Sequence, residues 1–256
     1  HKSLELSILP KIKSIIWATG FKYNYDWINL NITDERGFPI HKRGVTNHDG
    51  FYFMGLQWMH TSKSAQFIKQ KLINSPANSI NLRFSVPPLD SDHWTNIKEI
   101  GGGRIVGEAV HGIDLACYLF DSLPQSISAS APVDKTNNMV KDNQVFLNIN
   151  FANGSHASLQ YFSEANQILS KERIEVHGEG NSYILEDFKM LRFLEGSQDR
   201  SKTFSTGKGH KESLSIFFDY VRDKSQNPFT WEEIKAVSKA AIIAQDHINS
   251  GQQHNV

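Results

Sequence analysis

Cysteine is nearly absent from this chain of 256 residues, which carries Cys117 and no other. One thiol cannot form an intrachain disulfide or a zinc site built from several thiolates. No apolar run approaches the ~20 residues that a membrane-spanning helix needs, and the first residues lack the basic, apolar and small-residue pattern of a signal peptide. These absences predict a cytoplasmic protein with no metal site and no membrane partner.

An excess of charge of either sign is also missing. Lys and Arg number 27, and so do Asp and Glu, which gives a formal net charge of zero at pH 7. A protein whose main partner is a nucleic acid or an anionic membrane normally carries a basic surface. The charge balance therefore argues against both kinds of partner, and the length fits one large domain or two modest ones.

Glycine and ionisable residues gather in one stretch, Gly101–Phe120, which reads GGGRIVGEAVHGIDLACYLF. Three consecutive glycines indicate a sharp turn or a close approach of the backbone to another group. The apolar residues that follow predict a buried helix. Glu108, His111 and Asp114 are spaced by three residues and share one side of it. A histidine between two carboxylates can exchange protons near neutral pH, although a hydrogen-bonded helix histidine without chemistry is an alternative.

Alternating residues downstream predict strands joined by tight turns. The strongest signal is the pair 145–151 and 156–162 around Asn153-Gly154, where both turn residues tolerate positive φ. A second hairpin is expected from 171–177 and 182–187, and further strands at 80–85, 126–131 and 190–194. We expect a polar loop over 197–209 and helices over 210–223 and 231–249. Thr230 is positioned to cap the second of these helices.

The first part of the chain resembles the C-terminal end of flavin-containing monooxygenase-like proteins. The resemblance lies in IIWATGF (15–21), RGVTNHDGFYFMGL (43–56) and WMHTSKS (58–64), and it covers roughly residues 1–68. It implies a family that uses FAD and a nicotinamide cofactor. Ala18, Thr19 and Gly20 are the residues expected near the dinucleotide. The glycine-rich phosphate-binding turn of such proteins, G-x-G-x-x-G, occurs nowhere in this sequence.

From about residue 80 to 250 the chain resembles the C-terminal substrate domain of the glucose–fructose oxidoreductase, inositol dehydrogenase and MocA-like (Gfo/Idh/MocA) family. The motifs that carry it are SDHW (91–94), the stretch 101–119, FANGS (151–155), KERIEVHGEG (171–180), LEDF (185–188), KGHKESL (208–214) and the TWEE helix start. The resemblance implies an α+β fold with an open, largely antiparallel sheet backed by helices. We therefore expect two parts, an N-terminal α/β remnant at 1–73 and the substrate domain at 74–256, with no complete Rossmann domain.

The same resemblance implies the chemistry of an NAD- or NADP-dependent dehydrogenase that acts on a sugar or cyclitol. The family's catalytic histidine matches His111, and Glu108 or Asp114 would orient it. Many members place an Asp four residues before that histidine, where this chain has Gly107. Candidate substrate-binding residues are Asp92, His93, Trp94 and Arg104. Candidate cofactor-contacting glycines are Gly101, Gly102 and Gly103.

These expectations leave three interpretations of function open. The first is a fragment of a sugar or cyclitol oxidoreductase that lacks its nucleotide-binding half and is inactive alone. The second is a non-catalytic binding or oligomerisation module, in which the sheet face with Asn148 and Asn150 meets a second copy to form a homodimer. The third is an FAD/NADP-dependent monooxygenase-like fragment. The junction near residue 73 is either a real fusion or an artefact of the sequence.

Overall fold

Alternation of buried and outward-facing residues builds the large sheet of this computed structural model. In β5 (Gln144–Phe151) every second side chain is buried, and β7 (Glu172–Gly178) follows the same rule, as expected for strands with one face on the core. The structure describes residues 31, 33–35, 40, 59–88, 103–134, 139–140, 143–166, 168–205, 207–222, 224 and 230–250.

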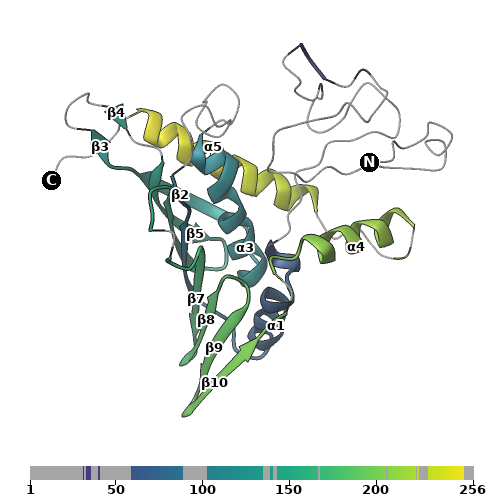
Figure 1. Cartoon of the computed structure of the whole chain (residues 1–256). Helices are drawn as coiled ribbons and strands as arrows, with labels where there is room; N and C mark the ends of the chain where they lie inside the picture. Colours follow the sequence, from purple (N-terminus) through teal and green to yellow (C-terminus); the bar gives the residue numbers. More distant parts are fainter. Residues whose placement is uncertain are drawn as a thin grey trace. The chain divides into compact units, whose positions relative to one another are not determined.

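Eight strands form one mixed sheet in the order β10-β9-β8-β7-β1-β6-β5-β2. The remaining strands of this sheet are β1 (Ser79–Ser85), β2 (Pro124–Ser130), β6 (His156–Phe162), β8 (Asn181–Glu186), β9 (Met190–Glu195) and β10 (Gln198–Thr203). β1 runs parallel to β6 and antiparallel to β7, and all other neighbouring pairs are antiparallel. The sheet is open, because β10 and β2 are edge strands (Figure 1). This confirms the predicted fold class.

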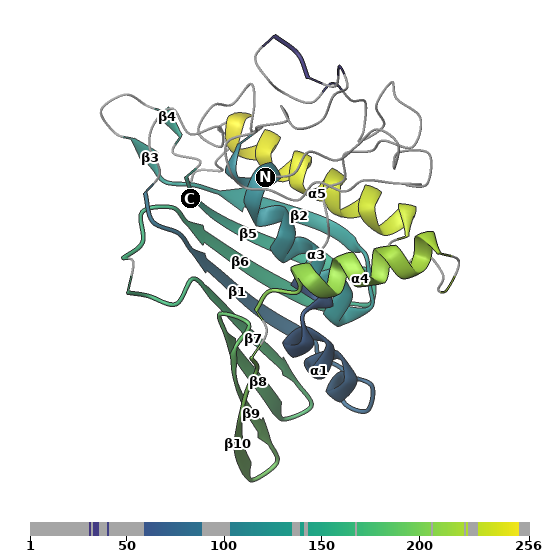
Figure 2. The ribbon, with the colours of Figure 1, turned by 45° about the vertical axis from the view of Figure 1, so that its right-hand side comes forward.

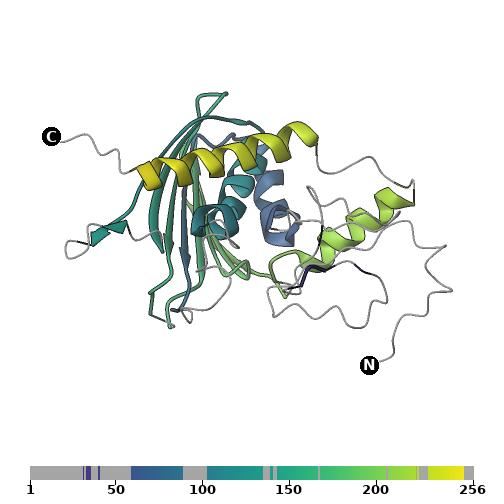
Figure 3. The same cartoon turned by 90° about the horizontal axis from the view of Figure 1, so that it is seen from above.

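The helices that belong to the sheet lie on one of its faces (Figures 2 and 3). They are the 3-10 turn η2 (Met59–Thr61), α1 (Lys63–Leu72), the π-helical turn η4 (Ile105–Ala109), α3 (Val110–Phe120) and α5 (Trp231–Ser250). Short strands β3 (Val133–Asp134) and β4 (Met139–Val140) pair separately, and α4 spans His210–Val221. α3 packs very closely on β6, since a Cβ atom on Gly112 would lie 2.2 Å from Leu159 Cδ1.

Contacts divide the chain into two compact units. One contains His1–Leu56 with Ser215–Pro228, and the other contains Gln57–Leu214 with Phe229–Val256. The sheet, α1, α3 and α5 all belong to the second unit. The predicted α/β remnant at 1–73 lies mostly outside the described residues. The boundary at residue 73 between this part and the substrate domain stays a prediction. The helix just before that boundary packs with the sheet unit.

One local prediction was wrong in detail. Residues 198–203 form the edge strand β10 rather than a loop, and all six of its side chains are exposed. A strand with no buried face carries no apolar alternation that could reveal it. The predicted β5–β6 hairpin is confirmed, and Gly154 in its turn has a φ of +85°. The four-residue connection is closed by Phe151 N–H donating to the carbonyl of Ser155 at 2.9 Å.

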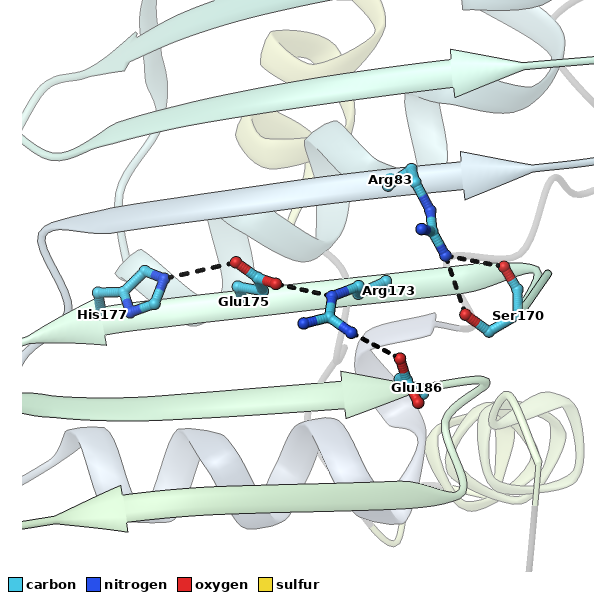
Figure 4. A network of polar contacts seen from close by, with 6 residues as sticks. All are labelled: Arg83, Ser170, Arg173, Glu175, His177 and Glu186. Atoms are coloured by element: carbon cyan, nitrogen blue, oxygen red, sulfur yellow. Dashed lines mark hydrogen bonds and ion pairs between the residues drawn. The ribbon is translucent and has the colours of Figure 1, made fainter. Parts of the chain in front are cut away.

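The face of the sheet that points away from the helices carries a polar network (Figure 4). Arg173 donates from Nε to Glu175 and from Nη1 to Glu186, each at 2.7 Å. Arg83 Nη2 donates to the carbonyl and the hydroxyl of Ser170. These side chains are only partly buried, so each pair contributes little to the free energy of folding. The network gives this face a polar, partly exposed surface.

Candidate active site

A π-helical turn begins the helix that carries His111. The N–H of Val110 donates to the carbonyl of Ile105, five residues earlier, so the turn is wider than an α-helical one. Turns of this kind interrupt helices mainly where a functional geometry holds them. Gly103 precedes the turn with a φ of +101°, a region that favours glycine. Gln245 of α5 lies against this bend, and its Oε1 accepts from the N–H of Ile105 at 3.3 Å.

His111 lies on α3 directly after the π-helical turn and is partly buried. The pKa of His111 is lowered from 6.5 to about 4, mainly by burial; the charge of Asp114 opposes this shift, and the nearby charges of His210 and Lys208 add to it. Near pH 7 the imidazole is therefore neutral. A neutral imidazole can accept a proton from a hydroxyl group, which is the chemistry expected of a general base.

Asp114 is buried one helical turn after His111, and its carboxylate is hydrogen-bonded to His60. His60 Nδ1 donates to Asp114 Oδ2 at 2.9 Å, and both side chains are buried. The ring of His60 stacks on Tyr118 with a centroid distance of 4.9 Å. Among the residues that the structure describes, Asp114 Oδ1 has no hydrogen-bond partner. Asp114 thus acts on His111 through its charge, while its Oδ2 is hydrogen-bonded to His60.

Glu108 and Arg104 meet at the hydroxyl of Tyr161. Arg104 is 2% exposed, and its Nη1 donates to Tyr161 Oη at 3.4 Å. Burial raises the pKa of Tyr161, the charge of Glu108 raises it further, and Arg104 opposes both. The hydroxyl therefore stays protonated at neutral pH. Glu108 and Arg104 are brought together with a strand residue that the spacing of the helix could not reveal.

A buried ion pair lies near His111 on the segment before α4. Lys208 Nζ donates to Glu172 Oε1, and Glu172 is 2% exposed. Burial lowers the pKa of Lys208, and the charge of Glu172 partly restores it. The neighbouring carbonyl of Gly209 accepts from Thr61 Oγ1 at 2.9 Å. Sequence reasoning used KGHKESL and WMHTSKS only as marks of resemblance, so it missed Lys208 and His60 as neighbours of the site.

The other predicted site residues cannot be placed. They lie outside the described residues, and this set consists of Ala18, Thr19, Gly20, Asp92, His93, Trp94, Gly101 and Gly102. Within the described ranges, no group of three or more His, Cys, Asp or Glu side chains is arranged to hold a metal ion. No helix found in those ranges is long and apolar enough to cross a membrane.

Comparisons with known proteins find one family model and several solved structures that are similar to the sheet domain. Residues 77–184 match the family model of the GFO/IDH/MocA C-terminal domain. UDP-N-acetylglucosamine 3-dehydrogenase from Acidithiobacillus ferrooxidans has a similar structure, with a TM-score of 0.62 and 13% identity over 76% of this chain and 60% of that chain. Levoglucosan dehydrogenase, in complex with NADH and levoglucosan, gives a TM-score of 0.63 and 16% identity over 76% of this chain and 63% of that chain. At these identities the likeness shows the fold alone.

A different kind of relative matches a short part of the chain. An uncharacterized CzcO-like oxidoreductase of Geobacillus kaustophilus (strain HTA426) is 50% identical over 56 residues, which are 22% of this chain and 16% of that protein. The chain thus covers less than two thirds of the length of each of these proteins. Residues 77–184 match the Gfo/Idh/MocA C-terminal domain, and the open sheet in which they lie has the fold of that domain.

Proposed function

We propose that this chain supplies the substrate domain of an NAD(P)-dependent dehydrogenase that acts on a hydroxyl or carbonyl group of a sugar or cyclitol. The observation that carries the proposal is the neutral, partly buried His111 on a π-to-α helix, within a domain that has the fold of sugar dehydrogenases. The names of two fold neighbours, which act on UDP-N-acetylglucosamine and levoglucosan, support a sugar-like substrate.

His111 would act as the acid/base on the reacting oxygen. In the oxidative direction its neutral imidazole accepts the hydroxyl proton, and in the reductive direction the imidazolium returns a proton to the carbonyl oxygen. The Asp114 carboxylate stabilises the imidazolium through its charge. Glu108 and Arg104 would shape the neighbouring wall through Tyr161, with Asp92, His93 and Trp94 as further substrate contacts.

A nicotinamide dinucleotide supplies the hydride acceptor in such enzymes, but the described glycine turn does not fit its pyrophosphate. A phosphate at a helix start needs free backbone N–H groups and room beside glycine. Here Gln245 accepts from the N–H of Ile105, and a Cβ on Gly103 would lie 2.3 Å from Gln245 Oε1. We therefore propose that Gly103 shapes the bend, that a separate nucleotide-binding domain holds NAD or NADP, and that this chain alone is inactive.

A ligand screen tests the proposed substrate class. Sugars and cyclitols would be titrated into the wild-type chain and into His111→Ala, with binding followed by calorimetry or ligand-detected NMR. We expect weak binding that His111→Ala reduces at least tenfold. His156→Ala is the matched control, because His156 lies on the outward sheet face and contacts Asn150. Sugar or cyclitol binding that His111→Ala leaves intact would rule out this site. NADH binding at micromolar concentration would contradict the proposal that a separate domain holds the dinucleotide.

The outward sheet face supports a second candidate, a homodimerisation module. Asn148 and Asn150 are exposed there, and Phe146 and Phe162 form an edge-to-face pair beside them. Sedimentation at high protein concentration tests this candidate, since a clean monomer would exclude it. The FAD-dependent alternative rests on the N-terminal resemblance and on the short oxidoreductase match. Purified chain that retains no flavin absorbance after incubation with FAD would exclude that alternative.

A further inference from the structure

The segment before α1 contributes a buried histidine to the helix of His111. His60 belongs to η2 (Met59–Thr61), which lies outside the residues matched by the Gfo/Idh/MocA model. Its Nδ1 lies 2.9 Å from Asp114 Oδ2 across 54 positions of sequence. An ionised carboxylate can only accept hydrogen bonds, so the imidazole Nδ1–H is the donor. The two parts of the chain are therefore joined by a directed, charge-assisted hydrogen bond.

The geometry leaves His60 little freedom. Its ring is 7% exposed and stacks on Tyr118 at an interplanar angle of 21°. Thr61, the next residue, donates to the carbonyl of Gly209 and fixes the turn from its other side. Ser62 then caps α1 by accepting from the N–H of Ala65. A buried ring that stacks on Tyr118 and lies in a hydrogen-bonded turn can fix the direction of the carboxylate that it contacts.

The carboxylate of Asp114 is buried, and His60 is its hydrogen-bond donor within the described residues. Asp114 is 3% exposed, and across the described part of the chain His60 supplies the hydrogen bond to Oδ2 while Oδ1 has no partner. A buried carboxylate without a donor pays a large desolvation penalty for its charge. The carboxylate beside His111 is thus hydrogen-bonded by a side chain that does not itself belong to the helix.

We propose that His60 is a positioning residue for His111: it holds the Asp114 carboxylate in place from the turn before α1 and so keeps a fixed negative charge one helical turn after His111. The role of His111 as acid/base is the proposed function above, and the significance of His60 for catalysis rests on it. The charge relation itself is a property of the folded chain. It can be measured without substrate, cofactor or a partner domain.

Other charged groups surround this pair and must be considered with it. The charges of Asp114 and His60 both act on Glu233 of α5, and so does that of Lys69 on α1. Lys208, before α4, and His210, its first residue, act on His111. Burial raises the pKa of Glu233, and the charge of Asp114 raises it further. Glu233 is therefore a competing carboxyl, and a Glu233→Gln background separates its titration from that of His111.

The test is an NMR titration of the His111 imidazole in three variants. His60→Phe keeps a ring on Tyr118 and removes the donor, and His60→Asn restores a donor near the place of Nδ1. Tyr183→Phe is the matched control, since this buried ring on β8 loses one hydrogen bond to Glu195 and lies away from α3. We expect the pKa of His111 to fall by about one unit in His60→Phe, because a nearby opposite charge usually shifts a pKa by 1–3 units.

The outcomes separate this inference from the proposed function. Recovery of the His111 pKa in His60→Asn, with no change in Tyr183→Phe, supports the positioning role. An unchanged or raised His111 pKa in folded His60→Phe overturns it. If acid unfolds a variant, a double-mutant cycle of His60→Phe and Asp114→Asn at pH 7 replaces the titration. A coupling of at least tenfold in the unfolding equilibrium is expected, and additive effects overturn the role. Failure of the sugar screen changes neither result.

Discussion

Gly112 allows helix α3 to approach the sheet, and a substitution there should reveal how tightly His111 is positioned. A Cβ atom at residue 112 would lie 2.2 Å from Leu159 Cδ1 and 3.2 Å from two ring carbons of Phe84. Leu159 has no exposed surface and Phe84 is 4% exposed, so neither has free space into which to move. Interiors packed at this density transmit such a displacement to the backbone. The helix that carries His111 would have to shift.

Two effects of opposite sign determine the result of Gly112→Ala. Replacing an interior helical glycine by alanine normally stabilises a helix by about 1 kcal/mol. Overpacking a filled core costs about 1–3 kcal/mol, so we expect a net loss of about 1 kcal/mol in the free energy of unfolding. In a Leu159→Ala background, which by itself costs about 2–5 kcal/mol, the 2.2 Å contact is gone and the space left by Leu159 lets the ring of Phe84 give way at its 3.2 Å contact. There the same Gly112→Ala change should stabilise by about 1 kcal/mol.

Urea unfolding followed by circular dichroism measures both backgrounds. Gly207→Ala is the matched control, because a Cβ there meets no atom within 4 Å and its φ is not positive; it should change stability by less than about 0.5 kcal/mol. The reversal of sign is the decisive feature. If Gly112→Ala stabilises the wild-type chain, or fails to help Leu159→Ala, the close helix–sheet contact does not have the role described here.

Two further predictions concern buried charge. The pKa of His111 is about 4 in the folded chain and 6.5 in the unfolded chain, so its contribution to stability is complete above pH 6.5. This contribution, at most about 3 kcal/mol, is lost as the pH falls toward 4. His111→Gln should therefore flatten the pH dependence of urea unfolding in that window, and an unchanged slope would contradict the assignment. Lys208→Met should lower the free energy of unfolding by about 3 kcal/mol, because it leaves the Glu172 carboxylate buried without its cation. Adding Glu172→Leu should recover most of this loss, and a double variant no more stable than Lys208→Met would count against the role of this pair.

Local patterns predicted most of the sheet. The alternation in β5 and β6 and the glycine-bearing turns are statements about neighbouring residues, and they gave those hairpins nearly to the residue. The parallel pairing of β1 with β6 joins segments far apart in sequence, and only resemblance to a family could supply it. β10 was missed because an edge strand exposed on both faces needs no apolar side chains.

In the site, local patterns predicted the positions of residues on the helix but not their partners from other elements. Helical spacing placed His111 and Asp114 on one helix, because residues three apart lie on the same side. It could not say which partner each side chain chooses, since His60, Tyr161 and Lys208 arrive from other elements. That Glu108 or Asp114 orients His111 therefore stays a prediction, and the hydrogen bond between Asp114 and His60 was not foreseen. Long-range partners of buried charges are the information that a local pattern lacks.

The contacts of the segment before β1 bear on where the folded unit begins. The families that the two parts resemble change near residue 73, yet the compact unit starts at Gln57. His60 donates to Asp114, Thr61 to the carbonyl of Gly209, and Lys71 to Glu195 on β9. Removing residues 57–73 would leave one buried carboxylate without its donor and would uncover the apolar surface on which α1 packs. The folded sheet domain thus includes a segment before residue 77 that the family model does not match.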